Sequence, residues 1–177
     1  MQNDLNVAES LFEWTVQEPR LKGPSVTQRF ISIVRSLHLI HNHLVSAAIL
    51  IDRGVGIELR DQVLVLLRRE RREYFITLSQ LFYLLASSVR TKFPLPNYLP
   101  DPACAVRRLI RKLRTLPAMT SHYPPMQAIH YYAFVNVSKE IAHELARIQI
   151  EILKLYGVNR ILALERDATF FALEDIV

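Results

Sequence analysis

The stretch Arg68–Pro102, RRERREYFITLSQLFYLLASSVRTKFPLPNYLPDP, decides the fold of this 177-residue chain. A charged turn leads into an apolar run at helical spacing, and a proline-rich segment follows it. Proline removes a backbone donor, clashes inside a helix and biases the preceding residue towards extended backbone. The stretch therefore predicts a long helix, then an extended connector over Phe93–Pro102, then a further helix that begins at the end of the connector.

Prolines and glycines elsewhere divide the rest of the chain into further helical windows. Asp101 and Pro102 are residue types that suit a helix N-cap and first position, and Gly157 suits the left-handed residue that ends a helix. We predict helices at about Leu5–Val16, Val26–Ile51, Glu58–Arg90, Pro102–Leu116 and Pro125–Tyr156.

The predicted fold class is all-α, an elongated antiparallel bundle of about five helices with an extended proline-rich connector. A helix over Glu58–Arg90 would be about 50 Å long, whereas a compact globule of this size is about 40 Å across. Residues 1–157 are predicted to form one helical domain, and residues 158–177 a C-terminal tail to which we assign no packing.

Apolar residues form one stripe along each long window, which predicts the core. In the second helix the stripe is Val26, Phe30, Ile33, Val34, Leu37, Ile40, Leu44, Ala48 and Ile51. In the third it is Leu59, Val63, Leu66, Leu67, Tyr74, Leu78, Leu81, Phe82 and Leu85, and in the fifth Phe134, Val137, Ile141, Leu145, Ile148, Ile152 and Leu155.

Composition excludes several classes of protein. Half of the residues are apolar, which disfavours disorder, and a single cysteine, Cys104, excludes a disulfide framework and indicates a reducing compartment. The longest uncharged run, Tyr74–Val89, is shorter than the roughly 20 apolar residues that a spanning helix needs. We therefore expect a buried core helix there and no transmembrane segment.

The net charge of +5 is concentrated in the fourth predicted helix. One face of that helix carries Val106, Leu109, Ile110 and Leu113, and the other carries Arg107, Arg108, Arg111, Lys112 and Arg114. No acidic residue lies between Pro102 and Lys139, so the helix holds no counter-charge of its own. A solvated face and a contact with the phosphates of anionic lipid both remain open, the latter contributing about 1 kcal/mol per basic residue.

A second basic run precedes the apolar helix. Arg68, Arg69, Arg71 and Arg72 alternate with Glu70 and Glu73. This pattern favours a solvated helix face stabilised by local ion pairs.

Candidate catalytic and metal sites are weak. His38, His41 and His43 resemble a metal-binding cluster in the sequence, but His41 and His43 would point about 200° apart on a helix, so this pair cannot converge on one ion. His41 lies on the apolar stripe and is expected to be a hydrogen-bonded core residue. Cys104 has no histidine beside it in sequence, and no phosphate-binding loop or hydrolase motif occurs. We predict no enzymatic activity, no cofactor and no metal.

Several segments together resemble the C-terminal cytosolic domain of the fungal aromatic acid exporter family, the proteins related to brefeldin A sensitivity protein. The matching segments are Trp14, Glu18–Pro24, Arg53–Val55, Arg68–Phe75, Leu85–Ser88, Lys92–Pro100 and Leu109–Leu116. They agree in order and spacing over residues 14–157, and the PLPNYLP segment is the most specific of them.

The resemblance implies a non-enzymatic cytosolic module of a transporter-like membrane protein, with the endoplasmic reticulum as one candidate membrane. It implies packing against the membrane domain of the parent protein, against an anionic lipid surface or against a second copy. Two features depart from the family pattern. Ser25-Val26 stands where an aromatic-proline pair is expected, and no spanning part precedes Met1, so we expect a fragment or a free-standing relative.

Two other functional classes remain as alternatives. A soluble adaptor would bind partner proteins through its apolar stripes and would not bind lipid. Nucleic-acid binding through the fourth helix ranks last and is not expected, because the chain outside residues 102–139 has a net charge of −1.

Overall fold

The computed structural model describes residues 2–17, 26–52, 63, 65–116 and 125–158. Five long helices lie within this part of the chain: α1 (Gln2–Gln17), α2 (Val26–Asp52), α4 (Arg68–Thr91), α5 (Pro102–Arg114) and α7 (Pro125–Tyr156). The all-α fold class is thus confirmed.

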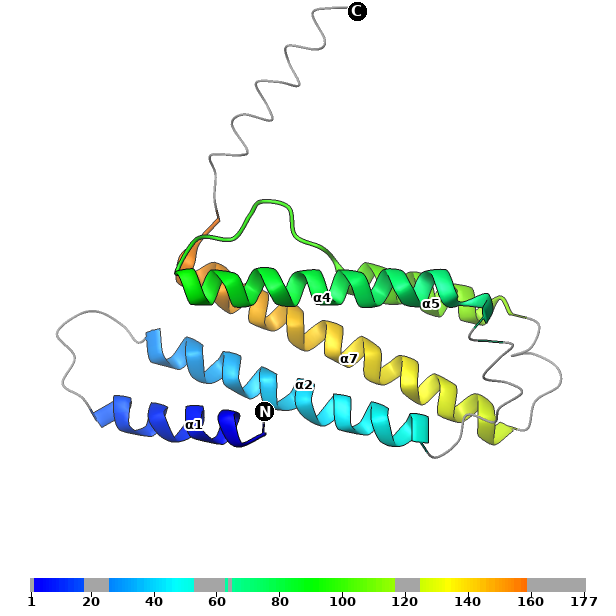
Figure 1. Ribbon diagram of the computed structural model, residues 1–177, viewed down its shortest axis with the longest axis horizontal. Coiled ribbons are helices and arrows are strands. Elements are labelled where there is room, and N and C mark those ends of the chain that lie inside the picture. The colour runs from blue at the N-terminus through cyan, green and yellow to red at the C-terminus, as the bar shows by residue number, and fades with distance from the viewer. Residues whose placement is uncertain (1, 18–25, 53–62, 64, 117–124, 159–177) are drawn as a thin grey trace, which may run out of the picture.

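The helices form an elongated bundle around α7 (Figure 1). Helix α2 packs along one side of α7, and α4 and α5 pack on the other. Helix α1 lies outside α2. Neighbouring pairs run antiparallel: α1 with α2, α2 with α7, and α4 with α5 (Figure 1). The beginning of α4 and the end of α5 therefore lie at the same end of the molecule.

Three clusters of buried side chains succeed one another along α7. The largest joins α2, α4 and the connector to the C-terminal half of α7, with Ile40, Leu81, Leu95, Leu145 and Ile152 among its most buried members. Tyr74, Ala105, Val106 and Ala142 form a small central cluster. The third joins Val63, Leu67, Leu109, Leu113 and Leu116 to Tyr131 and Val135. Helix α7 is the one element that contributes to all three.

The predicted boundaries of four of the five helices are confirmed to within a few residues, whereas the predicted start of the third helix, Glu58, lies outside the described residues. The predicted third helix does not run unbroken to Arg90, because Leu67 adopts φ −100° and ψ 10° and forms a turn between helical Leu66 and the start of α4 at Arg68. Leu67 is fully buried among α5 and α7 residues, and its backbone still accepts from Arg71 N at 2.9 Å and donates to Val63 O at 3.0 Å. Helix α4 is about 36 Å long.

The predicted stripes mark the core except near some of their ends. Ile141, Leu145, Ile148 and Ile152 of α7 are buried, as are Ile33, Val34 and Ile40 of α2. Val26, Leu44 and Ala48 of α2 are instead exposed, and so is Leu66. Leu59 and Ile51 lie outside the residues whose side chains the structure describes. The stripe of α2 thus extends beyond the surface that α7 covers.

The predicted connector closes one end of the bundle. Ser88 Oγ donates to Phe93 O at 2.6 Å, and Lys92 ends α4 in the left-handed conformation, with φ 56°. Leu95 is fully buried, and its amide donates to Gly157 O at 3.1 Å. Gly157 has φ 78°, as predicted for the residue that ends the last helix. Leu95 and Val158 form an isolated parallel bridge, and no strand occurs among the described residues.

None of the helices described here is both long enough and apolar enough to cross a bilayer. Tyr74–Val89, the uncharged run, contributes buried residues to two of the three clusters instead. The predicted domain of residues 1–157 remains a prediction, and residues 159–177 of the predicted tail lie outside the described part of the chain.

Candidate anion-binding surface

Helix α5 is fixed by its cap and by one apolar face. The Asp101 side chain accepts a hydrogen bond from Cys104 N at 3.0 Å, and Pro102 is the first helical residue, as predicted. Val106, Leu109 and Leu113 are fully buried. Burial of these three side chains leaves only one orientation for the helix, and it turns the opposite face to solvent.

All five predicted contact residues of α5, Arg107, Arg108, Arg111, Lys112 and Arg114, are exposed. Two of them nevertheless have acidic partners outside the helix. Arg108 Nη2 lies 2.5 Å from Glu73 Oε1 of α4, and Arg107 Nη2 lies 3.6 Å from Asp101 Oδ2. The basic face therefore has less unbalanced charge than the sequence of α5 alone indicates.

The three remaining cations have no ion-pair partner in the described part of the chain. Arg111, Lys112 and Arg114 occupy the last turn of α5, where positive charge interacts favourably with the helix dipole. That favourable position explains their presence without any ligand. Further observations from α4 are needed to decide between a solvated face and a binding surface.

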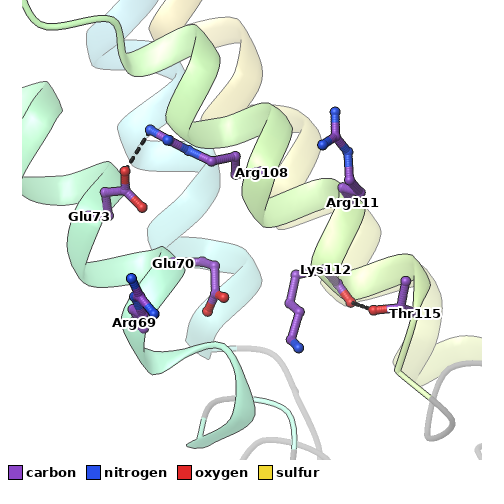
Figure 2. A pocket seen from close by; sticks show the side chains of 7 residues that line it. All are labelled: Arg69, Glu70, Glu73, Arg108, Arg111, Lys112 and Thr115. Atoms are coloured by element: carbon purple, nitrogen blue, oxygen red, sulfur yellow. Dashed lines mark hydrogen bonds and ion pairs between the residues drawn. The ribbon is translucent and has the colours of Figure 1, made fainter.

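The start of α4 supplies those observations. Arg69, Glu70 and Glu73 of α4 and Arg108, Arg111, Lys112 and Thr115 of α5 line a groove of about 550 Å³ between the two helices. In Figure 2 Glu70 and Lys112 extend into the space between the helices, and the Glu73–Arg108 ion pair spans it. The groove exists because α4 and α5 run antiparallel, so the basic start of one lies beside the basic end of the other.

The position of Arg68 and Arg69 is electrostatically unfavourable for α4 itself. Both lie in its first turn, at the positive end of the helix dipole, where acidic residues stabilise a helix and basic ones do not. Glu70 is the one acidic residue of that turn. The dipole of α4 therefore does not stabilise these arginines, and both side chains are exposed to solvent.

The charge of the groove is positive after its internal pair is counted. Arg108 and Glu73 neutralise each other, and Glu70 offsets one of the other cations. Arg69, Arg111 and Lys112 then leave a net charge of +2. Phosphate or carboxylate oxygens are suitable ligands, because guanidinium groups bind them through paired N–H donors and Lys as a point charge.

Nucleophilic or metal chemistry has little support in the described part of the chain. Cys104 lies in the first turn of α5, at the opposite end of that helix from the groove, and is half-buried. No three His, Cys, Asp or Glu residues among those described are placed to hold a metal ion. His38 Nε2 lies 3.3 Å from Glu9 Oε1 without hydrogen-bond geometry. His41 is half-buried, and the hydrogen-bonded core role predicted for it stays a prediction.

Two tyrosines buried near the groove have raised pKa values. Burial raises the pKa of Tyr74 to about 12, although its hydroxyl donates to Ser138 O at 2.8 Å. Burial also raises the pKa of Tyr131 to about 12, against the opposing effect of Arg71. Both phenols are therefore neutral at physiological pH and belong to the core rather than to the charged surface.

The sequence interpretation missed the part that α4 plays in this surface. It treated Arg68–Glu73 as a solvated face with local ion pairs, whereas Glu73 pairs with Arg108 of α5. The signal that could have revealed the groove is the short connector between the two helices. A connector of about ten residues favours antiparallel neighbours, which places the start of α4 beside the end of α5.

Comparison with family models, curated proteins and solved structures finds no match to this chain.

Proposed function

We propose that this chain is a non-enzymatic helical module of a transporter-like membrane protein. It works on the cytoplasmic side of a membrane, and the basic surface between α4 and α5 contacts anionic headgroups there. The resemblance of the sequence to the cytosolic domain of aromatic acid exporter-like proteins supports the membrane context, as does the chemistry of the surface. In the same proposal the module packs against the membrane domain of its parent protein or against a second copy.

The observation that carries the lipid contact is the groove lined by Arg69, Arg108, Arg111 and Lys112. It joins cations from two helices on one exposed surface, and three of these cations, Arg69, Arg111 and Lys112, have no ion-pair partner among the described residues. Basic residues near an anionic leaflet contribute about 1 kcal/mol each, and salt screens this attraction. A surface of this kind binds weakly by itself and adds to an existing membrane attachment.

Vesicle co-sedimentation tests the proposal. Reversal of two unpaired charges, in Arg111→Glu/Lys112→Glu, is expected to weaken binding to phosphatidylserine vesicles by more than about 30-fold at low salt. The matched control is Arg35→Glu/Arg90→Glu, which makes the same change in net charge at two exposed positions outside the groove. Equal binding by the wild type and both variants, or equal binding to uncharged phosphatidylcholine vesicles, would contradict the proposal.

A soluble adaptor is the second candidate, and one observation favours it. Leu44, Val45 and Ile49 are each about half exposed on the part of α2 that α7 leaves uncovered. Exposed apolar side chains that lie close together often mark a protein interface. Mass measurement in solution distinguishes the two candidates: a stable oligomer without affinity for lipid would favour the adaptor. Binding of duplex DNA that falls steeply with salt would instead indicate the nucleic-acid alternative.

A further inference from the structure

A second groove adjoins the basic one on α4 and has a different chemical character. It is lined by Val65, Leu66, Arg68, Arg69, Arg72, Glu73, Ile76 and Thr77. Arg69 and Glu73 line both grooves, so the two form one continuous surface. The second groove adds apolar side chains to the charged ones.

Three aliphatic side chains are exposed in this second groove. Val65 is 70% exposed, Leu66 is 55% exposed and Ile76 is 46% exposed. Single exposed apolar residues are common on proteins, but these three line the same groove together. The sequence stripe assigned Leu66 to the core, and its exposure departs from that prediction, whereas its neighbours Val63 and Leu67 are buried.

Basic residues surround these aliphatic side chains. Arg68, Arg69 and Arg72 line the same groove, and Arg108, Arg111 and Lys112 line the adjoining one. Glu70 and Glu73 are the acidic residues of the joint surface, so its net charge is +4. A surface that combines exposed aliphatic groups with surrounding arginines is complementary to the interface of an anionic bilayer, where apolar groups enter the acyl boundary and cations remain with the phosphates.

We infer that Val65 and Leu66 insert into the bilayer interface while the surrounding arginines bind lipid phosphates. This inference rests on the proposed membrane contact and extends it, because it names the anchor and the orientation of the bundle. The end of the molecule that carries the start of α4 and the end of α5 then faces the lipid. Insertion makes part of the binding resistant to salt, which purely electrostatic attraction is not.

A fluorophore that responds to polarity tests the insertion directly. Leu66→Cys in a Cys104→Ser background is labelled with a nitrobenzoxadiazole dye and mixed with phosphatidylserine vesicles. Its emission is expected to shift to the blue and to be quenched by lipids that carry a spin label in the upper acyl chain. The matched control is Leu44→Cys in the same background, since Leu44 is 45% exposed on α2, across α7 from α4, and is expected to show neither effect.

Co-sedimentation of the same labelled proteins separates the possible failures. Sedimentation with vesicles but no spectral shift at position 66 would overturn the insertion and leave the proposed lipid contact intact. No sedimentation at all would overturn both. A shift at position 66 without vesicles, growing with protein concentration, would show that a second copy covers this face and would also overturn the insertion.

An unlabelled pair of variants gives an independent measurement. Val65→Ser/Leu66→Ser is expected to reduce vesicle partitioning about tenfold, and the reduction should persist in high salt. Leu44→Ser/Val45→Ser removes the same two side-chain types from α2 and is expected to bind as the wild type does. An equal effect of the two double variants would overturn the inference.

Discussion

At the scale of single residues, the buried hydroxyl of Tyr74 is the clearest polar contact between helices. It links α4 to Ser138 O of α7 at 2.8 Å. Tyr74→Phe removes this hydrogen bond and is expected to lower the free energy of unfolding by about 1 kcal/mol, measured by urea denaturation. Tyr83→Phe is the control, because Tyr83 is 75% exposed and should change nothing. Equal stabilities of the two variants would show that the Tyr74 bond contributes no net stability.

The same burial predicts a loss of stability in alkali. Folding raises the pKa of Tyr74 and of Tyr131 from 10.0 to about 12, so the unfolded chain releases these protons at lower pH than the folded chain does. Their contribution to stability is complete below pH 10 and is lost as pH rises towards 12. Urea midpoints measured from pH 8 to 11 should therefore fall less steeply in Tyr74→Phe/Tyr131→Phe than in the wild type. A parallel fall in both proteins would contradict the assignment.

At the scale of elements, α5 depends on its N-cap more than the long helices do. It has 13 residues, and short helices gain much of their stability from caps and packing. Asp101→Ala removes the acceptor of the Cys104 amide and is expected to cost about 1 kcal/mol in the free energy of unfolding.

The conservative change at Asp101 separates the cap from the ion pair. Asp101→Asn keeps an oxygen acceptor for the Cys104 amide but loses the charge that faces Arg107 at 3.6 Å. Exposed ion pairs contribute little, so this variant should be nearly as stable as the wild type. A loss as large as that of Asp101→Ala would assign the effect to the ion pair instead.

At the scale of the whole molecule, α7 contributes to all three core clusters, and we expect them to unfold as one cooperative unit. Leu145→Ala, in the largest cluster, is expected to cost 2 to 5 kcal/mol as an order of magnitude, and Val135→Ala, in the cluster at the other end, should cost less. Both should shift a single urea transition without changing its slope. Ile150→Ala is the control, since Ile150 is 49% exposed on the same helix. A second transition in either core variant would show that the clusters unfold separately.

The sequence predicts this architecture well because residue types that favour helix ends stand at several of its helix boundaries. Asp101, Pro102 and Gly157 have the predicted capping roles, and the stripe of α7 is the buried face. The interruption at Leu67 was not predictable from local pattern, because no proline or glycine marks it.

Of the candidate surface, only the part contributed by α5 could be predicted from the sequence. The exposed cations of α5 follow from its amphipathic pattern, because the buried face fixes where the other residues point. Their neighbours on α4 depend on which helices lie side by side, and periodicity along one helix carries no such information. The ion pair of Arg108 with Glu73 and the exposure of Leu66 belong to this second class.

The attachment of Leu95 to Gly157 constrains the number of residues between the end of α4 and Leu95. Pro94 and Pro96 have no amide hydrogen, so Leu95 is the sole residue of that trio able to bond Gly157 O. If one residue were inserted or deleted between Lys92 and Leu95, the segment would have to shift relative to Gly157, which would bring a proline opposite the acceptor and move Leu95 out of its buried position. Natural variants of this protein should therefore tolerate substitutions between residues 92 and 95 far better than changes in their number.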